Sequence, residues 1–417
     1  GTKDILPSDI SKWKFVESVI NKTMGNFNYS EIRTPVFEET ALFCRGIGEA
    51  TDIVSKEMYT FTDKGGTSLT LRPEMTASVV RAFIEHSMAA KQNLNKLYYI
   101  APMFRQERPQ AGRLRQFHQF GAEALGSASP ALDAELITIA YDILKQLGLK
   151  NLTVKINSLG TPEARNQYKS VLRSYLSDKL SELSEESRKR FETNILRIFD
   201  SKEANDIRIM DNAPRLPDYL DEESASEFRL VRDILERSGI PFEVDAKLVR
   251  GLDYYTKTTF EIVSSSVGSQ SALCGGGRYD LLVEQLGGKP VPAVGFAAGI
   301  ERILLACENE KSLAIPDDKL DLYIIRLDES GAGRVSDHAL ALRRKGLSVE
   351  VDYLARSVKA QMREANRLNA RFAIILGGSE FEENKFTLKN MADGTQELIA
   401  MDDLDSVYQK VISTKGE

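Results

Sequence analysis

The hydrophobic positions at the start of the chain switch between helical and strand periods. Apolar residues at three- and four-residue spacing predict a helix over residues 11–26. Residues 29–38 predict a strand, and because Pro35 has no N–H to donate, that strand should lie at a sheet edge or an interface. The stretch 41–60 reads as a loop that runs into a strand. The apolar runs on either side of Lys64-Gly65-Gly66 predict a β-hairpin.

The pattern is most informative at residues 99–123, which predict two strands joined by a long basic loop. On a strand, alternate side chains share a face. One face of the second strand therefore carries a cation, an aromatic ring, an amide, a bare backbone and a carboxylate, contributed by Arg115, Phe117, Gln119, Gly121 and Glu123. Such a face is poorly suited to a core and well suited to the floor of a ligand site.

The loop between these two strands is dense in arginine. Arg105, Arg108, Arg113 and Arg115 stand against a single acid, Glu107. Guanidinium groups at this density are suited to gripping phosphate oxygens bidentately. From composition alone, an edge hairpin with a solvated basic tip explains the pattern equally well.

Two later segments have a different character from the first part. Residues 161–235 are rich in Glu, Lys, Arg and Ser at helical spacing, which predicts a mostly helical insertion. Its mixed charges favour a solvated surface over a strong RNA-binding patch. The strand-like residues that follow lead into three consecutive glycines, 275–277, which would let backbone approach a ligand closely. A dinucleotide site is not indicated, because the GxGxxG spacing is absent.

After a linker at 312–319, strand and helix periods alternate and predict a compact α/β module over 320–417. A hairpin should turn at Asp393-Gly394, and a last helix should lie near 402–413. Residues 343–371 hold eight Lys or Arg against three Asp or Glu. A solvated helix face is the ordinary explanation for that charge.

Composition narrows the class of protein. At 417 residues, with 42% apolar and 28% charged residues, the chain should form two or three globular domains. A net charge of −6 argues against indiscriminate nucleic-acid coating, although a local basic patch can still bind RNA. The three cysteines are far apart and lack metal-ligand spacing, which favours a reducing cytoplasm. The sequence shows neither a membrane-spanning apolar run nor a secretory leader, so we expect no membrane partner.

Four stretches together resemble the class II aminoacyl-tRNA synthetases, and among them the histidyl-tRNA synthetase family. FRQERP, with the arginine-rich loop and QFHQFGAE, is similar to motif 2 of that class. LRPEMTA at 71–77, LVRGLDYYT at 248–256, and CGGGRYD with GFAAGIERI at 274–303 follow in the family's order. The resemblance extends over nearly the whole chain. The strand containing Pro35 resembles motif 1, which implies a homodimer.

The resemblance implies an α+β fold, with a class II synthetase antiparallel sheet flanked by helices. The catalytic core would comprise residues 1–160 and 236–311, the helical insertion 161–235, and a C-terminal α/β anticodon-binding domain 320–417. The implied activity is ATP-dependent ligation of L-histidine to the 3′ end of tRNA(His) through a histidyl-adenylate, with Mg²⁺ accompanying ATP. DNA is not an expected partner.

The resemblance also implies residue roles. Because negative charge builds on phosphoryl oxygens during adenylate formation, fixed cations are needed. The catalytic residues would be Arg105, on the α-phosphate, and Arg250, beside the substrate carboxylate. The remaining ATP contacts would come from Glu107, Arg113, Phe117 and Arg302. The histidine contacts would come from Glu74, Thr76, Gln119, Glu123, Arg250, Tyr254, Tyr255 and Tyr279. Arg108 and Gln110 would meet the tRNA acceptor end, and no side chain is assigned as a metal ligand.

Two other functions share this fold. The first is the non-catalytic regulatory subunit of ATP phosphoribosyltransferase in histidine biosynthesis, which typically lacks the anticodon-type module and tends to lose the ATP-gripping arginines. The second is a sensor of uncharged tRNA, which would sit in a much longer chain. The presence of Arg105, Arg113 and Arg302, and of the last module, favours the enzyme.

Overall fold

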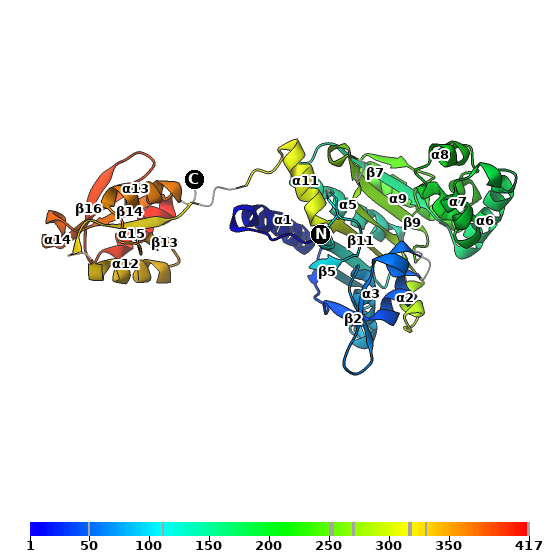
Figure 1. The fold of residues 1–417 in the computed structure, drawn as a ribbon, viewed down its shortest axis with the longest axis horizontal. Coiled ribbons are helices and arrows are strands. Elements are labelled where there is room, and N and C mark those ends of the chain that lie inside the picture. Colours follow the sequence, from blue (N-terminus) through cyan, green and yellow to red (C-terminus); the bar gives the residue numbers. More distant parts are fainter. Residues whose placement is uncertain are drawn as a thin grey trace. The chain divides into compact units, whose positions relative to one another are not determined.

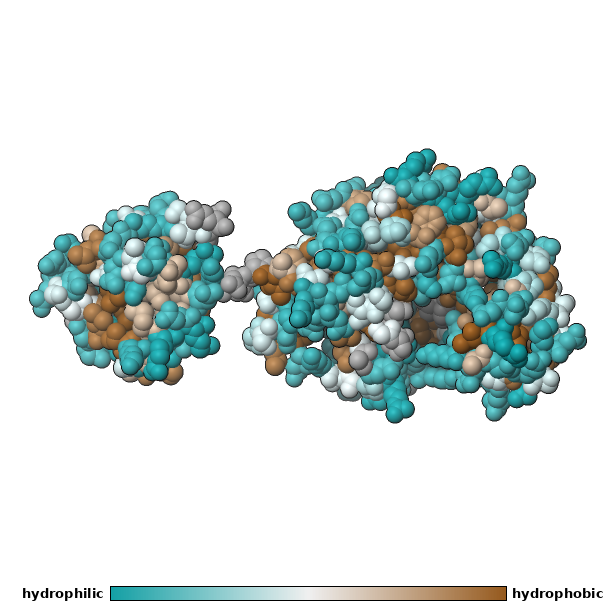
Figure 2. All heavy atoms as spheres, turned by 90° about the horizontal axis from the view of Figure 1, so that it is seen from above, coloured by the Kyte–Doolittle hydropathy of each residue, from teal (hydrophilic) through white to brown (hydrophobic). Residues whose placement is uncertain are grey.

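The computed structural model describes residues 1–48, 51–110, 112–249, 254–268, 272–315, 319–329 and 332–414. They divide into two compact units, Gly1–Ala314 and Ile315–Glu417 (Figure 1). Each unit has its own hydrophobic core, and polar side chains cover most of the surface seen in Figure 2. Within the described ranges, no helix has the length and apolar character needed to cross a bilayer.

The first unit is organised around an eight-stranded sheet in which β6 lies between β5 and β11. Its strands, in spatial order, are β1 (Ser30–Glu31), β5 (Asn95–Phe104), β6 (Gln116–Leu125), β11 (Ala293–Gly299), β10 (Ala272–Arg278), β9 (Thr258–Ser264), β7 (Leu152–Ser158) and β8 (Phe242–Val244). Neighbours pair antiparallel except β1 with β5 and β7 with β8. The predicted antiparallel sheet with flanking helices is confirmed.

Strand β6 sends alternate side chains into different environments, as the sequence pattern predicts. Phe120, Ala122 and Ala124 lie in a core shared with four helices. Those helices are α1 (Pro7–Asn26), α5 (Pro130–Gln146), α9 (Glu222–Arg237) and α11 (Ile300–Glu310). Gly121 and Glu123 point to the opposite face, where Tyr99 and α3 (Thr76–Glu85) lie. The face of β6 that carries Gln119, Gly121 and Glu123, the floor face, is therefore separated from the face that packs in the core.

The predicted strand at 29–38 is wrong in its extent, because the chain splits there between two sheets. Residues Ser30–Glu31 form β1 in the large sheet, whereas β2 (Phe37–Glu39) pairs with β4 (Ser68–Leu71) in a three-stranded sheet completed by β3 (Tyr59–Thr62). Pro35 lies at the break, where no ladder donor is needed. The buried Arg72 fixes this corner by donating to the carbonyls of Thr34 at 2.8 Å and Pro35 at 3.1 Å.

The predicted loop over 41–60 is also wrong in part. Residues Thr40–Ile47 form helix α2, whose Leu42, Phe43 and Ile47 are buried against α3. Gly46 suggested a loop, but it lies inside the helix where a side chain would crowd Ala77, and Gly48 ends the helix at a φ of 103°. Tertiary packing therefore overrides the local glycine signal here.

Between β7 and β8 the chain is helical, as predicted for the insertion. The elements are α6 (Pro162–Ser177), η2 (Leu180–Glu182), α7 (Glu185–Thr193), η3 (Ile195–Asp200), α8 (Ala204–Asp211), η4 (Leu216–Tyr219) and α9. The buried Asp206 ties them together, because its carboxylate accepts hydroxyl hydrogen bonds from Ser184, Ser187 and Ser201.

The second unit contains a five-stranded sheet of order β13-β12-β14-β15-β16. Its elements are β12 (Leu322–Arg326), α12 (Ala332–Arg344), β13 (Val349–Val351), α13 (Val358–Arg367), β14 (Phe372–Leu376), α14 (Ser379–Glu382), β15 (Lys385–Asn390), β16 (Gln396–Ala400) and α15 (Leu404–Ser413). The alternating α/β order, the hairpin at Asp393-Gly394 and the last helix are confirmed.

Candidate active site

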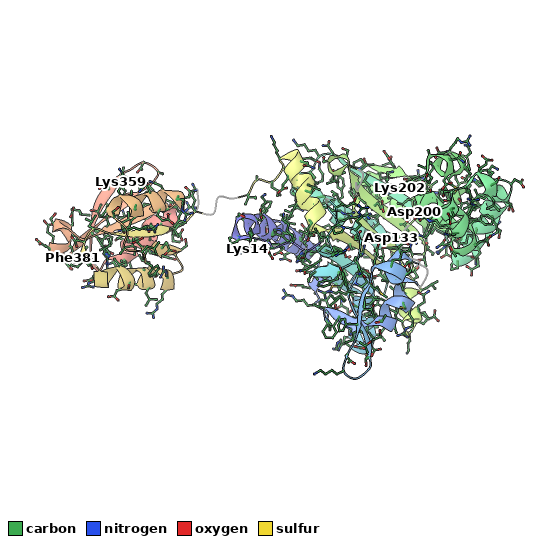
Figure 3. All side chains as sticks on the ribbon, viewed as in Figure 1. Lys14, Asp133, Asp200, Lys202, Lys359 and Phe381 are labelled. Carbon is green, nitrogen blue, oxygen red and sulfur yellow. The ribbon has the colours of Figure 1, made fainter. Side chains whose placement is uncertain are left out.

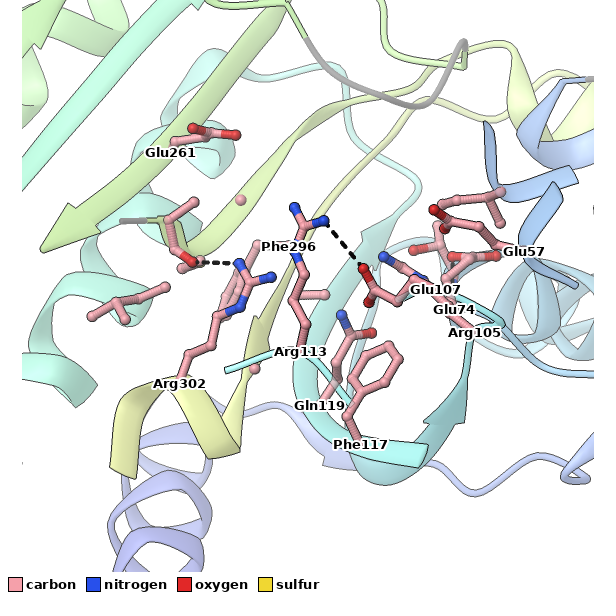
Figure 4. A pocket seen from close by; sticks show the side chains of 18 of the residues that line it. Glu57, Glu74, Arg105, Glu107, Arg113, Phe117, Gln119, Glu261, Phe296 and Arg302 are labelled. Atoms are coloured by element: carbon pink, nitrogen blue, oxygen red, sulfur yellow. Dashed lines mark hydrogen bonds and ion pairs between the residues drawn. The ribbon is translucent and has the colours of Figure 1, made fainter. Parts of the chain in front are cut away.

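A cavity of about 460 Å³ lies over the floor face of β6 (Figure 4). Its walls come from segments that are far apart in the sequence, including the loop between β5 and β6, strands β6, β9, β10 and β11, the starts of α3 and α11, and η3 of the insertion. The cavity is lined mainly by charged and polar side chains and by tyrosines. Such a lining indicates a site for a charged ligand rather than an apolar one.

Glu123 is fully buried directly beneath the cavity, where its partners Thr76 and Tyr279 form part of the lining. Its carboxylate accepts hydrogen bonds from the hydroxyls of Thr76 at 2.8 Å, Tyr99 at 3.4 Å and Tyr279. Burial raises the pKa of Glu123 to about 8, although the hydroxyl donors oppose that rise. Among the residues that the structure describes, the partners of this carboxylate are therefore hydroxyls and not an arginine.

Glu74 is a second buried carboxylate in the cavity wall. It accepts hydrogen bonds from the backbone N–H groups of Thr76 at 2.7 Å and Ala77 at 2.9 Å, so it caps the start of α3. Burial raises the pKa of Glu74 as well. The residue therefore satisfies the first N–H groups of the helix from a position just before it and also lines the cavity.

Glycines on β6 and β11 make room for this base. Glu123 stands opposite Gly295 in the ladder, where an added Cβ would lie 1.7 Å from the Glu123 Oε2. At Gly121 an added Cβ would lie 2.4 Å from the Tyr99 hydroxyl oxygen. The buried carboxylate and its hydroxyl partners thus require both glycines.

Three tyrosines form one side of the cavity. The ring of Tyr254 lies 4.7 Å from that of Tyr255 and 5.5 Å from that of Tyr279. Burial raises the pKa values of Tyr254 and Tyr279 well above the ordinary range, so their hydroxyls stay neutral donors. Gln119 also lines the cavity, and its buried Oε1 atom has no hydrogen-bond partner among the described residues. An orphaned acceptor aimed at a cavity is suited to a ligand donor.

Three arginines, Arg105, Arg113 and Arg302, are placed around the cavity (Figure 4). Arg105 donates through Nε to the Pro73 carbonyl at 2.9 Å, and its guanidinium lies 5.3 Å from the Phe117 ring centre. Arg113 pairs with Glu107 at 3.2 Å.

Arg302 reaches the cavity from α11. It donates to the carbonyls of Gly112 and Ala272, both at 2.9 Å. Burial, together with nearby Arg113 and Arg105, lowers the pKa of Arg302. In the described part of the chain, neither Arg105 nor Arg302 is paired with a carboxylate, so these guanidinium groups can receive an anion.

The structure brings most of the sequence-predicted site residues together. The residues that line this cavity are Glu74, Thr76, Arg105, Glu107, Arg113, Phe117, Gln119, Tyr254, Tyr255, Tyr279 and Arg302. Glu123 lies directly beneath them. Arg108 and Gln110 line an adjoining outer cavity that shares Glu107 and Arg113. Arg250 lies outside the described residues.

Sequence reasoning missed several lining residues. Glu57, Glu261 and Glu301 face the cavity, and Arg197 reaches it from η3. Glu301 could have been found, because it lies within the GFAAGIERI stretch; its carboxylate accepts from the His118 backbone N–H at 2.9 Å. Arg197 carried no signal, since its position depends on how the insertion folds. It pairs with Asp52 at 3.0 Å.

Known proteins match the whole chain. A family model of histidyl-tRNA synthetase matches residues 1–303, and a model of an anticodon binding domain matches residues 321–410. The chain is 48% identical to a histidine–tRNA ligase of Halothermothrix orenii over 413 residues, covering 99% of this chain and 98% of that protein. It is also 48% identical to the Listeria monocytogenes enzyme, covering 100% and 98%.

Solved structures agree with these matches. The apo histidyl-tRNA synthetase of S. aureus is 40% identical, with a TM-score of 0.83 and 98% coverage of both chains. A Bacillus halodurans protein described as an ATP phosphoribosyltransferase regulatory subunit/histidyl-tRNA synthetase is 21% identical, with a TM-score of 0.64 over 91% of this chain and 97% of that one. That second likeness concerns the fold alone.

The raised pKa of Glu123 makes stability depend on pH. The folded protein holds this proton up to a pH of about 8, whereas the unfolded chain releases it near the ordinary value of 4.5. The folded state therefore binds more protons across that interval, and its stability falls as pH rises, by about 1.4 kcal/mol per pH unit at most.

Because glutamine does not ionise, the melting temperature of wild type should fall relative to Glu123→Gln between pH 5 and pH 9. Glu185→Gln, at an exposed ion pair, is the control and should show no such divergence. A constant gap between wild type and Glu123→Gln across this range would contradict the prediction.

Proposed function

Because the chain belongs to the histidyl-tRNA synthetase family and so ligates L-histidine to tRNA(His) with ATP, we propose that both steps of this reaction take place in the cavity over β6. The observation that carries the proposal is the meeting, in one cavity, of a polar base built on Glu123 and the guanidinium groups of Arg105, Arg113 and Arg302. The polar base suits an amino acid, and the guanidinium groups suit the negatively charged phosphates of a nucleoside triphosphate.

In the first step, a carboxylate oxygen of histidine attacks the α-phosphorus of ATP. The new P–O bond forms as the bond to the β-phosphate oxygen breaks, and pyrophosphate leaves. We propose that Arg105 holds the α-phosphate and that Arg113 and Arg302 hold the β/γ end. The support is that Arg105 and Arg302 reach the cavity without a carboxylate partner in the described chain. Fixed cations of this kind stabilise the charge that develops on the phosphoryl oxygens. Arg250 is proposed beside the substrate carboxylate on the resemblance alone.

The adenine would lie against Phe117, whose ring is already held beside the Arg105 guanidinium. Glu107 would accept a hydrogen bond from the adenine amino group. In the free protein Glu107 pairs with Arg113. Binding of ATP would therefore exchange an internal ion pair for contacts from both residues to the nucleotide.

The histidine would occupy the tyrosine-lined part of the cavity. Glu74, Thr76 and Gln119 would take its α-ammonium group, and the orphaned Gln119 Oε1 supports this assignment. Glu123 and Tyr255 would take the two imidazole nitrogens, with Tyr254 and Tyr279 packed around the ring.

In the second step, a hydroxyl of the 3′-terminal adenosine of tRNA attacks the carbonyl carbon of the adenylate. The ester bond forms as the bond to the phosphate oxygen breaks, and AMP leaves. Arg108 and Gln110 line the outer cavity beside Arg113, a position suited to the acceptor end. The division into a catalytic core of 1–160 and 236–311, an insertion of 161–235 and a tRNA-binding module of 320–417 is part of this proposal.

We propose Mg²⁺ as part of the ATP substrate. Magnesium usually keeps several waters and binds through substrate phosphates and one or two carboxylates. The described residues include no group of three or more His, Cys, Asp or Glu placed to hold a metal. Glu261, Glu301 and Glu57 line the cavity singly. This arrangement suits an ion that enters on the triphosphate.

The regulatory-subunit function is less well supported. The chain retains the arginines and the anticodon-type module that such a subunit tends to lack. Histidine-dependent exchange of pyrophosphate into ATP, followed by charging of tRNA, tests the enzymatic function directly. Absence of both activities in folded protein would overturn it.

The first prediction of this proposal concerns Glu123. Replacing it with alanine should lower histidine-dependent ATP–pyrophosphate exchange at least about 10²-fold, since a buried hydrogen bond to a charged group contributes about 1.5–3 kcal/mol. The KM for ATP should change little, because the three arginines are untouched. If Glu123 were only a structural partner, the melting temperature would fall while the KM for histidine stayed constant. Exchange kinetics and thermal melting, measured on the same preparation, separate the two outcomes.

The second prediction concerns the C-terminal module. Deleting residues 320–417 should leave adenylate formation largely intact, because the cavity residues all lie before residue 303 and the first unit has its own core. Charging of tRNA should collapse. Circular dichroism checks that the shortened protein folds, and an unchanged KM for tRNA would exclude a tRNA-binding role for the module.

The third prediction concerns assembly. Phe37 and Phe61 are exposed on the three-stranded sheet with their rings 6.4 Å apart, and the preceding Val36 is exposed as well. We propose that this motif 1 region forms a homodimer with two-fold symmetry in the cytoplasm. Sedimentation at micromolar concentration should give a dimer for wild type and a monomer for the Phe37→Asp, Phe61→Asp double variant. Leu398→Asp, at another exposed apolar position, is the control and should remain dimeric. A monomeric wild type would reject the proposal.

A further inference from the structure

Two neighbouring apolar side chains project from the second unit. Tyr353 and Leu354 are each 74% exposed, more than the other exposed large hydrophobic residues in the described chain. They lie between β13 and α13, in the loop 352–357. Exposed loop tips usually carry polar residues, so the exposure of these two apolar side chains indicates a binding surface.

The loop that carries this pair is held in one conformation. Asp352 accepts hydrogen bonds from the backbone N–H of Arg356 at 2.7 Å and from its guanidinium Nε. Between these two residues, Ala355 has a φ of 51°, a left-handed conformation that is costly for a residue with a Cβ. Backbone strain of this kind persists only where the surroundings impose it.

A buried glutamine fixes the far side of the loop. The Gln361 Nε2 donates to the Arg356 carbonyl at 2.8 Å and to the Arg326 carbonyl at 3.1 Å, while its Oε1 accepts from the Arg326 N–H at 2.9 Å. The loop is thereby fastened to the end of β12, an interior strand of the sheet. Tyr353 and Leu354 are consequently presented on a preformed platform, which reduces the ordering entropy that binding would cost.

Positive charge adjoins the platform. Lys359 and Arg363 follow on α13 one turn apart, and both are exposed (Figure 3 labels Lys359). Neither makes an ion pair within the described residues, in contrast to Arg356 and Arg367, which both pair with Glu364. The first turns of α13, which follow the loop in the chain, therefore carry two exposed cations that are available to a ligand.

A rigid exposed aromatic ring beside unpaired cations matches single-stranded RNA. Unpaired bases stack on aromatic side chains in a sequence-tolerant way, while cations take the adjacent phosphates. A peptide partner would be expected to need a larger apolar surface than two side chains. The match of this unit to an anticodon binding domain agrees with the RNA assignment.

We propose that Tyr353, flanked by Leu354, is the stacking platform for one unpaired base of the tRNA anticodon loop, and that Lys359 and Arg363 hold the adjoining phosphates. The proposal rests on the proposed function and assigns a specific contact within it. Tyr353 would then contribute to the choice of tRNA although it lies in a different unit from the catalytic cavity.

The first test compares stacking with other roles. Tyr353→Ala should lower kcat/KM for tRNA charging about 10- to 100-fold, the loss expected for one base–aromatic stack. Tyr353→Phe and Tyr353→Trp should stay within about 3-fold of wild type, because every aromatic ring can stack. Histidine-dependent ATP–pyrophosphate exchange should be unchanged in all three. Leu398→Ala, at another exposed apolar position of the same unit, should leave charging unchanged.

The second test identifies the base. Wild type and Tyr353→Ala are compared on tRNA transcripts that each carry one abasic nucleotide in the anticodon loop. The penalty of Tyr353→Ala should disappear for one transcript and persist for the others. A penalty that is equal for all transcripts, or a loss in Tyr353→Phe as large as in Tyr353→Ala, would overturn the stacking role. A wild type that charges no transcript would instead overturn the proposed function itself.

The phosphate contacts have a separate signature. The Lys359→Ala, Arg363→Ala double variant should weaken charging of every transcript to a similar degree and should reduce the dependence of the KM for tRNA on salt. Retention of the wild-type salt dependence would remove Lys359 and Arg363 from the proposal.

Discussion

The first unit depends on burying a carboxylate in the middle of its sheet. An isolated ionised carboxylate is very costly to remove from water, so burial raises the pKa of Glu123 to about 8, and no cation pairs with it among the described residues. The hydroxyls of Thr76, Tyr99 and Tyr279 surround it instead, and they come from three different segments of the chain. Each donor is in turn fixed by its own element, so the base of the cavity is as rigid as the sheet and helices that supply it.

The stretch CGGGRYD shows how the sheet serves this base. It is not a flexible loop, because β10 runs through it in a regular ladder with β11. A Cβ on Gly276 would lie 2.3 Å from the Gly295 carbonyl oxygen, so glycine permits the close approach of the two strands. The next residues face opposite sides: Arg278 is buried in an ion pair with Asp133 of α5 (labelled in Figure 3), whereas Tyr279 reaches Glu123. One short strand thus ties the helical layer to the base of the cavity.

The alternation on β6 could be predicted from the sequence because a strand has a fixed two-residue period. That period alone separated Gln119 and Glu123 from Phe120, and the structure confirms the separation. Helix α2 could not be predicted in the same way, because its stability comes from burial against α3 and not from local propensity. The place of Arg197 in the cavity depends on the packing of the whole insertion. Such long-range contacts cannot be predicted from the residues that neighbour Arg197 in the sequence.

The side chains at the base of the cavity and those at its rim, where the insertion meets the core, are held by interactions of different strength. The base consists of buried hydrogen bonds, whereas the rim includes the Arg197–Asp52 ion pair between the insertion and the core, in which Asp52 is substantially exposed. Exposed ion pairs contribute only about 0–1 kcal/mol. Directly after Asp52, the short π-helical turn Ile53–Glu57 ends at a carbonyl that accepts the Gln106 N–H at 2.7 Å, next to Arg105. Five residues therefore connect the ion pair to the arginine-bearing loop, whereas the buried base is held separately. This arrangement suits the proposed roles, in which the small substrate is recognised at a rigid base and the large substrate enters past the rim.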